Sequence, residues 1–215
     1  MNLNKYIEHT LLKQDAAKQD FEKLLQEAKE YDFKGVCVNP FNVASAKKYL
    51  KDTDVKVVTV VGFPLGANVS EVKAFEAQRA VQDGADEIDM VINVSKLKDK
   101  DYDYIKQDIE TVKAACEGKI LKVILETDLL TKEEIKKACE LCIEAKADFV
   151  KTSTGFVKNG VGAKVEDVTL MAETVKPYGL GVKASGGIRD KEKAIALIEA
   201  GADRLGTSSG VAIVS

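Results

Sequence analysis

Tryptophan is absent from this chain of 215 residues, and histidine occurs once, as His9. A single histidine argues against a zinc site with several His ligands. A Ser-His-Asp triad would have to use His9, and no nucleophile motif accompanies it. Aromatic residues make up only 6% of the chain, so side chains on which nucleic-acid bases could stack are scarce.

Strong charge of one sign is also lacking. The chain has 32 basic and 35 acidic residues, for a net charge of −3, which predicts neither a nucleic-acid partner nor a polybasic membrane surface. The first residues, MNLNKYIEHTLLK, are too polar for a signal peptide, and no apolar run approaches the ~20 residues of a membrane span. We therefore expect a soluble, cytoplasmic protein.

Cysteines are few, at positions 37, 116, 139 and 142. Without an export signal, a disulfide framework is not expected in a chain of this size. Cys139 and Cys142 form a C-x-x-C, but they continue the helical spacing of Ile135 and Ala138. This pattern favours a buried helix face over a redox or zinc site.

What the chain does contain is a series of short apolar runs rich in Val and Ile. Such runs are typical of parallel strands that are buried on both faces. Seven are clear, and an eighth candidate, Tyr6–Thr10, precedes the first helical pattern. The seven runs are Gly35–Val38, Val55–Val61, Glu87–Asn93, Ile120–Glu126, Phe149–Thr152, Gly181–Ala184 and Arg204–Thr207.

Amphipathic patterns with the helical period of 3.6 separate these runs. One of them opens with a predicted capping box, Thr131-Lys-Glu-Glu134. A weak repeat, Gly84-Ala-Asp86, Lys146-Ala-Asp148 and Gly201-Ala-Asp203, marks three helix-to-strand turns. We therefore predict an α/β fold, a (β/α)8 TIM barrel that forms a single domain over residues 1–215. The alternative is a doubly wound open sheet, which is disfavoured because no G-x-G-x-x-G follows the first strand.

Ionisable residues occupy three of the predicted strands where apolar residues are expected. Asp89 interrupts its strand, Lys151 ends one, and Lys183 precedes a Gly-rich turn. A buried lysine loses its proton readily, and a second ammonium nearby favours that loss. A neutral lysine is a nucleophile toward carbonyl carbon. Structural pairing would explain any one of these residues alone, but the three together predict an amine nucleophile with a carboxylate that carries protons.

Two other charged residues are expected to have lesser roles. Lys122 begins its predicted strand, so we expect it at the bottom of the barrel in a structural role, paired inside the barrel. Glu126 ends the same strand and is a further candidate for a polar residue of the site.

Small and hydroxylated residues follow the last three predicted strands, at Thr152–Gly155, Ser185–Gly187 and Gly206–Ser209. Turns of this kind let backbone N–H groups and hydroxyls surround an anion. Each turn alone is a weak signal, but three on consecutive late strands predict a phosphorylated substrate.

The segments IDMVIN, FVKTSTGF, GVKASGGIR and GTSSGVAIV, together with HTLLK, CVNPFNV and VVGFPLGA, resemble the deoxyribose-phosphate aldolases over nearly the whole chain. The resemblance implies a (β/α)8 barrel that reversibly cleaves 2-deoxy-D-ribose 5-phosphate to D-glyceraldehyde 3-phosphate and acetaldehyde. It implies no metal and no organic cofactor, and a homo-oligomer, either a dimer or a tetramer.

The resemblance also implies roles for individual residues. Lys151 matches the Schiff-base lysine, Lys183 the second lysine that helps it lose its proton, and Asp89 the acid/base carboxylate. The residues that it places at the sugar phosphate are Thr152, Gly155, Gly186, Gly187, Ser208 and Ser209.

Two residues of the early strands need separate mention. The family commonly has Asp where this chain has Glu8, and we expect the change to affect how a substrate hydroxyl is held but to leave the lysine chemistry untouched. Cys37 is expected to be a packing residue that lies near the site.

The residues alone leave two other functions open. One is a different phosphate-binding barrel enzyme, an isomerase or a synthase, in which the lysines only contact the anion. The other is a non-catalytic barrel that binds a sugar phosphate.

Overall fold

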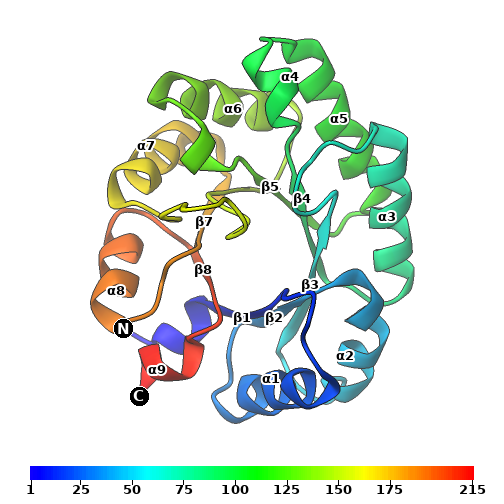
Figure 1. Ribbon diagram of the computed structural model, residues 1–215, viewed down its shortest axis with the longest axis vertical. Coiled ribbons are helices and arrows are strands. Elements are labelled where there is room, and N and C mark those ends of the chain that lie inside the picture. Colours follow the sequence, from blue (N-terminus) through cyan, green and yellow to red (C-terminus); the bar gives the residue numbers. More distant parts are fainter.

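The computed structural model covers residues 1–215 and contains eight parallel strands that close into a barrel in sequential order (Figure 1). This confirms the predicted TIM barrel over the open sheet. The strands are β1 (Ile7–Leu11), β2 (Gly35–Val38), β3 (Lys56–Val61), β4 (Glu87–Val91), β5 (Ile120–Ile124), β6 (Phe149–Lys151), β7 (Gly181–Ser185) and β8 (Arg204–Thr207).

Helices surround the barrel and cover the outer face of the strands (Figure 1). The α-helices are α1 (Lys18–Glu30), α2 (Val43–Tyr49), α3 (Ser70–Gln82), α4 (Val94–Lys98), α5 (Tyr102–Ala115), α6 (Lys132–Glu144), α7 (Val165–Val175), α8 (Lys191–Glu199) and α9 (Gly210–Val214). Short 3-10 helices are η1 (Leu3–Tyr6), η2 (Pro40–Asn42), η3 (Thr127–Leu129) and η4 (Lys176–Tyr178). None of these helices is long and apolar enough to cross a membrane.

Most strand bounds agree with the prediction, and the bounds of β2 and β8 match it in full. β5 ends at Ile124, two residues earlier than predicted, because Glu126 adopts a left-handed conformation with φ of 63° that turns the chain out of the sheet. The eighth predicted strand is present as β1, shifted by one residue.

The main hydrophobic core lies between the strands and the helices. Cys139 and Cys142 are buried there on α6, as free thiols, and the predicted capping box at Thr131 and Glu134 opens that helix. The lone histidine also has a structural role. His9 lies 2.8 Å from the Glu27 carboxylate on α1, and its ring packs against Phe33.

The repeated Ala-Asp turns connect neighbouring strands in pairs. The Asp86 carboxylate accepts a hydrogen bond from the Val57 N–H at 2.9 Å and another from Lys47 on α2 at 2.7 Å. Asp148 contacts Leu121 N–H and Lys113 in the same manner, and Asp203 contacts Val182 N–H and Lys176. Each repeat thus fixes one strand to its predecessor: β4 to β3, β6 to β5 and β8 to β7.

The residue two positions before each of these aspartates has a positive φ. Two of them are Gly84 and Gly201, but the third is Lys146, with φ of 57°. Left-handed backbone is costly for a residue with a Cβ. We therefore expect Lys146→Gly to raise the free energy of unfolding by about 0.5–1 kcal/mol in urea denaturation, since Lys146 is exposed.

Gly118 provides the matched control. It has φ of 81°, and no atom lies within 4 Å of the place where its Cβ would be. Gly118→Ala should therefore lower stability by a similar amount through backbone strain alone. A loss of stability in Lys146→Gly would contradict the explanation.

The interior of the barrel has two different sides. Leu12, Cys37, Val58 and Val60 form a small apolar cluster on the side of β2 and β3, separate from the main core. The remaining strands direct charged residues inward. This charged side is where the predicted catalytic residues meet.

Candidate active site

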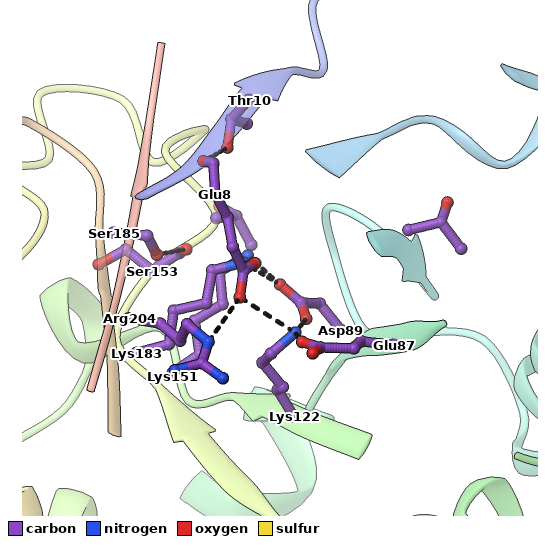
Figure 2. A network of polar contacts seen from close by, with 12 residues as sticks. Glu8, Thr10, Glu87, Asp89, Lys122, Lys151, Ser153, Lys183, Ser185 and Arg204 are labelled. Atoms are coloured by element: carbon purple, nitrogen blue, oxygen red, sulfur yellow. Dashed lines mark hydrogen bonds and ion pairs between the residues drawn. The ribbon is translucent and has the colours of Figure 1, made fainter. Parts of the chain in front are cut away.

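A network of buried charges fills the barrel interior, and Asp89 on β4 is at its centre (Figure 2). Asp89 Oδ2 accepts hydrogen bonds from Lys151 Nζ at 2.8 Å and from Lys183 Nζ at 2.7 Å. Lys122 Nζ donates to the other oxygen, Oδ1, at 2.9 Å. The structure thus brings together Asp89, Lys151 and Lys183, the three residues that the sequence singles out.

Lys122 also belongs to this network. It lies in the middle of β5, in register with Asp89, rather than at the bottom of the barrel as predicted. It is fully buried and forms an ion pair with Glu87 at 2.5 Å. Pairing inside the barrel was expected, but direct contact with the candidate catalytic carboxylate was not.

The expectation for Glu8 is wrong in one respect. Its carboxylate, fully buried on β1, accepts a hydrogen bond from Lys183 and lies 3.4 Å from Lys122 Nζ and 3.8 Å from Arg204 Nε (Figure 2). Glu8 therefore acts on the lysine pair directly. The residue was misjudged because the direction of its side chain depends on the closure of β1 against β8, which no local pattern reveals.

The electrostatics of the network fix most of its charges. Burial opposes the charge on Asp89, but the three lysines outweigh it and hold the pKa of Asp89 well below its usual range. Burial also opposes the charge on Lys183, but Asp89 and Glu8 raise the pKa of Lys183 well above its usual range. The same two carboxylates raise the pKa of Lys122 against the effect of burial. Asp89 is thus a carboxylate, and Lys122 and Lys183 are ammonium groups, at neutral pH.

Charge balance then distinguishes Lys151 from the other lysines. The network contains four basic side chains and three carboxylates. The basic side chains thus outnumber the carboxylates by one. Lys122 and Lys183 each have two or more carboxylates as partners, whereas Lys151 has Asp89 alone. The basic residues are Lys122, Lys151, Lys183 and Arg204, and the carboxylates are Glu8, Glu87 and Asp89.

Lys151 is also the one member of the network on the wall of the cavity at the carboxyl ends of the strands. This cavity of about 310 Å³ opens at the carboxyl ends of β1, β6, β7 and β8. Its wall contains Lys151, the segments 153–156 and 185–189, and residues 10–13 and 206–208. Asp89 and Lys183 lie behind Lys151 and do not reach the wall. A molecule in the cavity can therefore meet the Lys151 amine first.

The far wall of this cavity is suited to an anion. The backbone N–H groups of Gly186, Gly187 and Ser208 have no acceptor within the protein. Gly187 has φ of 67°, and a Cβ there would lie 2.4 Å from the Val161 carbonyl oxygen, so only glycine fits. Donors that converge in this way bind phosphate groups well.

Two cations on this wall were missed by the sequence reasoning. Lys13 and Arg189 are exposed and line the same cavity. The signal for Arg189 was available, since it directly follows a Gly-rich turn at the end of a predicted strand. Both side chains add positive charge where the free N–H groups converge.

Two of the predicted phosphate contacts lie outside the cavity wall. Thr152 is fully buried, and its hydroxyl both donates to the Ser185 carbonyl and accepts from the Ser185 N–H. The side chain of Ser209 is not on the wall either, and its N–H donates to Thr207 Oγ1. Gly155, Gly186, Gly187 and Ser208 do line the cavity.

Glu126 and Cys37 support the site without lining it. The Glu126 carboxylate accepts from the Thr154 N–H at 3.0 Å and from the Thr154 hydroxyl, which positions a residue of the cavity wall. Burial raises the pKa of Glu126. Cys37 packs in the apolar cluster, and burial raises the pKa of its thiol, although Lys183 and Lys151 oppose that shift. No group of three or more His, Cys, Asp or Glu side chains is arranged to hold a metal ion.

Comparison with known proteins gives consistent matches over the full chain. The sequence profile of the DeoC/LacD family of aldolases matches residues 4–215. A deoxyribose-phosphate aldolase of Finegoldia magna is 60% identical, covering 100% of this chain and 99% of the relative. One from Thermococcus gammatolerans is 61% identical and covers 100% and 96%. The tetrameric deoxyribose phosphate aldolase of Aeropyrum pernix superposes with a TM-score of 0.90 at 36% identity, covering 99% of this chain and 89% of the other.

Proposed function

The chain belongs to the DeoC/LacD family of aldolases, and we propose that it catalyses its reaction through a Schiff base on Lys151. Its activity is that of a deoxyribose-phosphate aldolase, an aldehyde-lyase that reversibly cleaves 2-deoxy-D-ribose 5-phosphate to D-glyceraldehyde 3-phosphate and acetaldehyde. The observation that carries the proposal is the position of Lys151, which is the only residue of the buried charge network on the cavity wall.

The first step is attack by the neutral Lys151 amine on the aldehyde carbon, C1, of the open-chain sugar. Loss of water from the carbinolamine gives an iminium, whose nitrogen lies beside the Asp89 carboxylate. That carboxylate remains ionised and stabilises the new positive charge. The substrate phosphate, bound at the Gly186–Gly187 turn, holds the far end of the chain and positions C1 at the amine.

Cleavage follows because the iminium accepts electrons. A base removes the proton of the C3 hydroxyl, the bond between C2 and C3 breaks, and its electron pair forms the C1–C2 double bond of an enamine. C3 becomes the aldehyde carbon of glyceraldehyde 3-phosphate. We assign the transfer of this proton to Asp89, acting through a water because its side chain does not reach the cavity wall. Protonation of the enamine at C2 and hydrolysis release acetaldehyde and restore the amine.

Lys183 acts from behind the nucleophile. It remains an ammonium, shares the Asp89 oxygen with Lys151, and so disfavours a second positive charge on Lys151. Glu8 holds Lys183 in place from the opposite side. The phosphate contacts that we propose are Gly155, Gly186, Gly187 and Ser208, joined by Lys13 and Arg189.

Borohydride trapping tests this proposal. Reduction in the presence of acetaldehyde should attach a two-carbon group to the chain irreversibly, and peptide mapping should find it on Lys151. Lys183 serves as the internal control, since it is buried behind the wall and should remain unmodified. Absence of an adduct at any lysine would favour a phosphate-binding isomerase, synthase or non-catalytic barrel, and an adduct confined to Lys183 would reverse the assigned roles.

We also propose that the chain acts as one catalytic domain within a cytoplasmic homo-oligomer. Four free, buried cysteines are in keeping with a reducing compartment. The relative from Aeropyrum pernix is a tetramer, which supports self-association here.

A further inference from the structure

Ser153 carries the one hydroxyl on the cavity wall that is buried and has no hydrogen-bond partner within the protein. Neither the Schiff-base chemistry nor the phosphate contacts described so far make use of it. A buried polar group without a partner costs free energy, and most such groups in folded proteins are paired. On the wall of a binding cavity, an unpaired hydroxyl of this kind is suited to a partner that the bound molecule supplies.

The other hydroxyls of the wall differ from Ser153 in this respect. Four of them donate to acceptors of the protein, and the fifth, on Ser208, is exposed to solvent. The four are Thr10, which donates to the Glu8 carbonyl at 2.9 Å, Thr154 to the Glu126 carboxylate, Ser185 to the Ser153 carbonyl at 2.6 Å, and Thr207 to the Ile188 carbonyl at 2.7 Å. Ser153 is therefore the buried hydroxyl of the wall that remains free both to donate and to accept.

Ser153 lies between the nucleophile and the phosphate end of the cavity. Lys151 and Ser153 both line the cavity, whereas Thr152 between them is turned away from it, as the alternation of side chains along an extended strand requires. On its other side Ser153 adjoins the Gly186–Gly187 turn. A Cβ on Gly186 would lie 3.3 Å from Ser153 Cβ and 3.7 Å from Ser153 Oγ. A molecule that extends from the amine to this turn therefore passes Ser153.

Hydrogen bonds to β7 fix the backbone of Ser153. Its carbonyl accepts from the Ser185 hydroxyl, and these two residues lie side by side in Figure 2. The Thr152 hydroxyl donates to the Ser185 carbonyl and accepts from the Ser185 N–H, both at 2.9 Å. The hydroxyl of Ser153 is thus positioned before a substrate binds, which reduces the entropy lost when it forms a hydrogen bond.

The substrate offers two hydroxyls between its aldehyde carbon and its phosphate, on C3 and on C4. The C3 hydroxyl gives up its proton during cleavage and must face the base, whereas C4 is bonded to the carbon that carries the phosphate. Because Ser153 adjoins the phosphate turn, we propose that Ser153 Oγ forms a hydrogen bond with the C4 hydroxyl and selects the configuration of that carbon. This assignment rests on the proposed function, which places C1 at Lys151 and the phosphate at the Gly186–Gly187 turn.

The selection acts on the acceptor aldehyde when the reaction runs in the direction of synthesis. C4 of the sugar is then C2 of glyceraldehyde 3-phosphate, which is the one stereocentre of that molecule. A hydrogen bond from a fixed wall residue can form with the hydroxyl of the D isomer, whereas the L isomer directs its hydroxyl elsewhere when its aldehyde and phosphate are held in the same places. Ser153 is therefore a residue that determines specificity, and it has no part in proton transfer.

The test compares two acceptors in condensation with acetaldehyde. One is D-glyceraldehyde 3-phosphate, and the other is 3-phosphooxypropanal, which lacks only the hydroxyl. Ser153→Ala should lower kcat/KM for D-glyceraldehyde 3-phosphate about 10–100-fold and leave the value for 3-phosphooxypropanal within about twofold of wild type. The preference of the variant for D- over L-glyceraldehyde 3-phosphate should fall by a similar factor.

Thr207→Val is the matched control. The Thr207 hydroxyl lies on the same wall, but it already donates to a backbone carbonyl, so its loss should change kcat/KM for the two acceptors by the same factor. The preference between acceptors is a ratio measured in one preparation, so partial unfolding does not affect it. An unchanged preference in Ser153→Ala would overturn the proposal, and so would a loss of affinity for inorganic phosphate that accounts for the whole effect.

Binding provides a second measurement that does not depend on turnover. The ligands are the alcohol formed by reduction of D-glyceraldehyde 3-phosphate and the same alcohol without its middle hydroxyl. Calorimetry should show that wild type binds the first more tightly and that Ser153→Ala binds both alike; a preference that survives in the variant would refute the contact. Borohydride trapping with acetaldehyde, which has no hydroxyl, should still label Lys151 in Ser153→Ala, so a failure of the Schiff-base proposal is detected separately.

Discussion

Lys151→Arg is expected to lower kcat for cleavage of deoxyribose 5-phosphate by at least about 10⁴-fold. Arginine keeps a positive charge beside Asp89, but its guanidinium does not lose its proton and cannot form the Schiff base. The phosphate turns are untouched, so the affinity for the sugar phosphate should change little. Initial rates and equilibrium binding of inorganic phosphate measure the two effects separately.

The control for this variant is Lys158→Arg. Lys158 is exposed in the loop that follows β6 and has no role in the network, so the same substitution there should leave kcat unchanged. Cleavage by Lys151→Arg at the wild-type rate would refute the Schiff-base mechanism. Loss of phosphate affinity together with kcat would show instead that the substitution has disturbed the cavity.

Lys183→Met is expected to lower kcat at neutral pH by about 10²–10⁴-fold and to move the acidic limb of the pH–rate profile to higher pH by roughly 1–2 units. Because Asp89 and Glu8 raise the pKa of Lys183 well above its usual range, the wild-type residue is positively charged over the whole working pH range. Its removal leaves three cations with three carboxylates. The positive charge of Lys183, which opposes protonation of the neighbouring nucleophile, is then missing, so the acidic limb moves to higher pH.

Removal of a carboxylate should shift the acidic limb of the pH–rate profile in the opposite direction, to lower pH. Glu8→Gln removes one of the three carboxylates and leaves the charge on Lys183 less compensated, so the acidic limb should move to lower pH than in the wild-type enzyme. Methionine and glutamine retain most of the original side-chain volume, and thermal unfolding will show whether each variant folds. Shifts in the same direction for Lys183→Met and Glu8→Gln would contradict the charge-balance argument.

The fold could be predicted from the sequence because parallel strands and helices leave strong local patterns. The runs that became β2 and β8 were bounded correctly, since Val and small residues are flanked there by clear turn signals. The meeting of Asp89, Lys151 and Lys183 also followed from position along their strands. The sequence does not predict how deep each side chain lies along the barrel axis, because that depth depends on the stagger between neighbouring strands.

The errors at the site have two different origins. Side chains alternate across a strand, so an inward Lys151 implies that Thr152 points outward, and this prediction could have been made from the sequence. Glu8 and Lys122 are different. Glu8 on β1 contacts both Lys122 on β5 and Lys183 on β7, and only the closed barrel brings these strands together.

The order of the network residues along the chain separates the two signs of charge. All three carboxylates come from the first four strands, and all four basic side chains come from the last four. Each half-barrel alone would therefore have an interior of like charges, which repel when buried. Two copies of the same half cannot close on each other without that penalty, whereas the first and second halves attract. The catalytic charges thus also specify which halves assemble, and they oppose strand-swapped dimers made from identical halves.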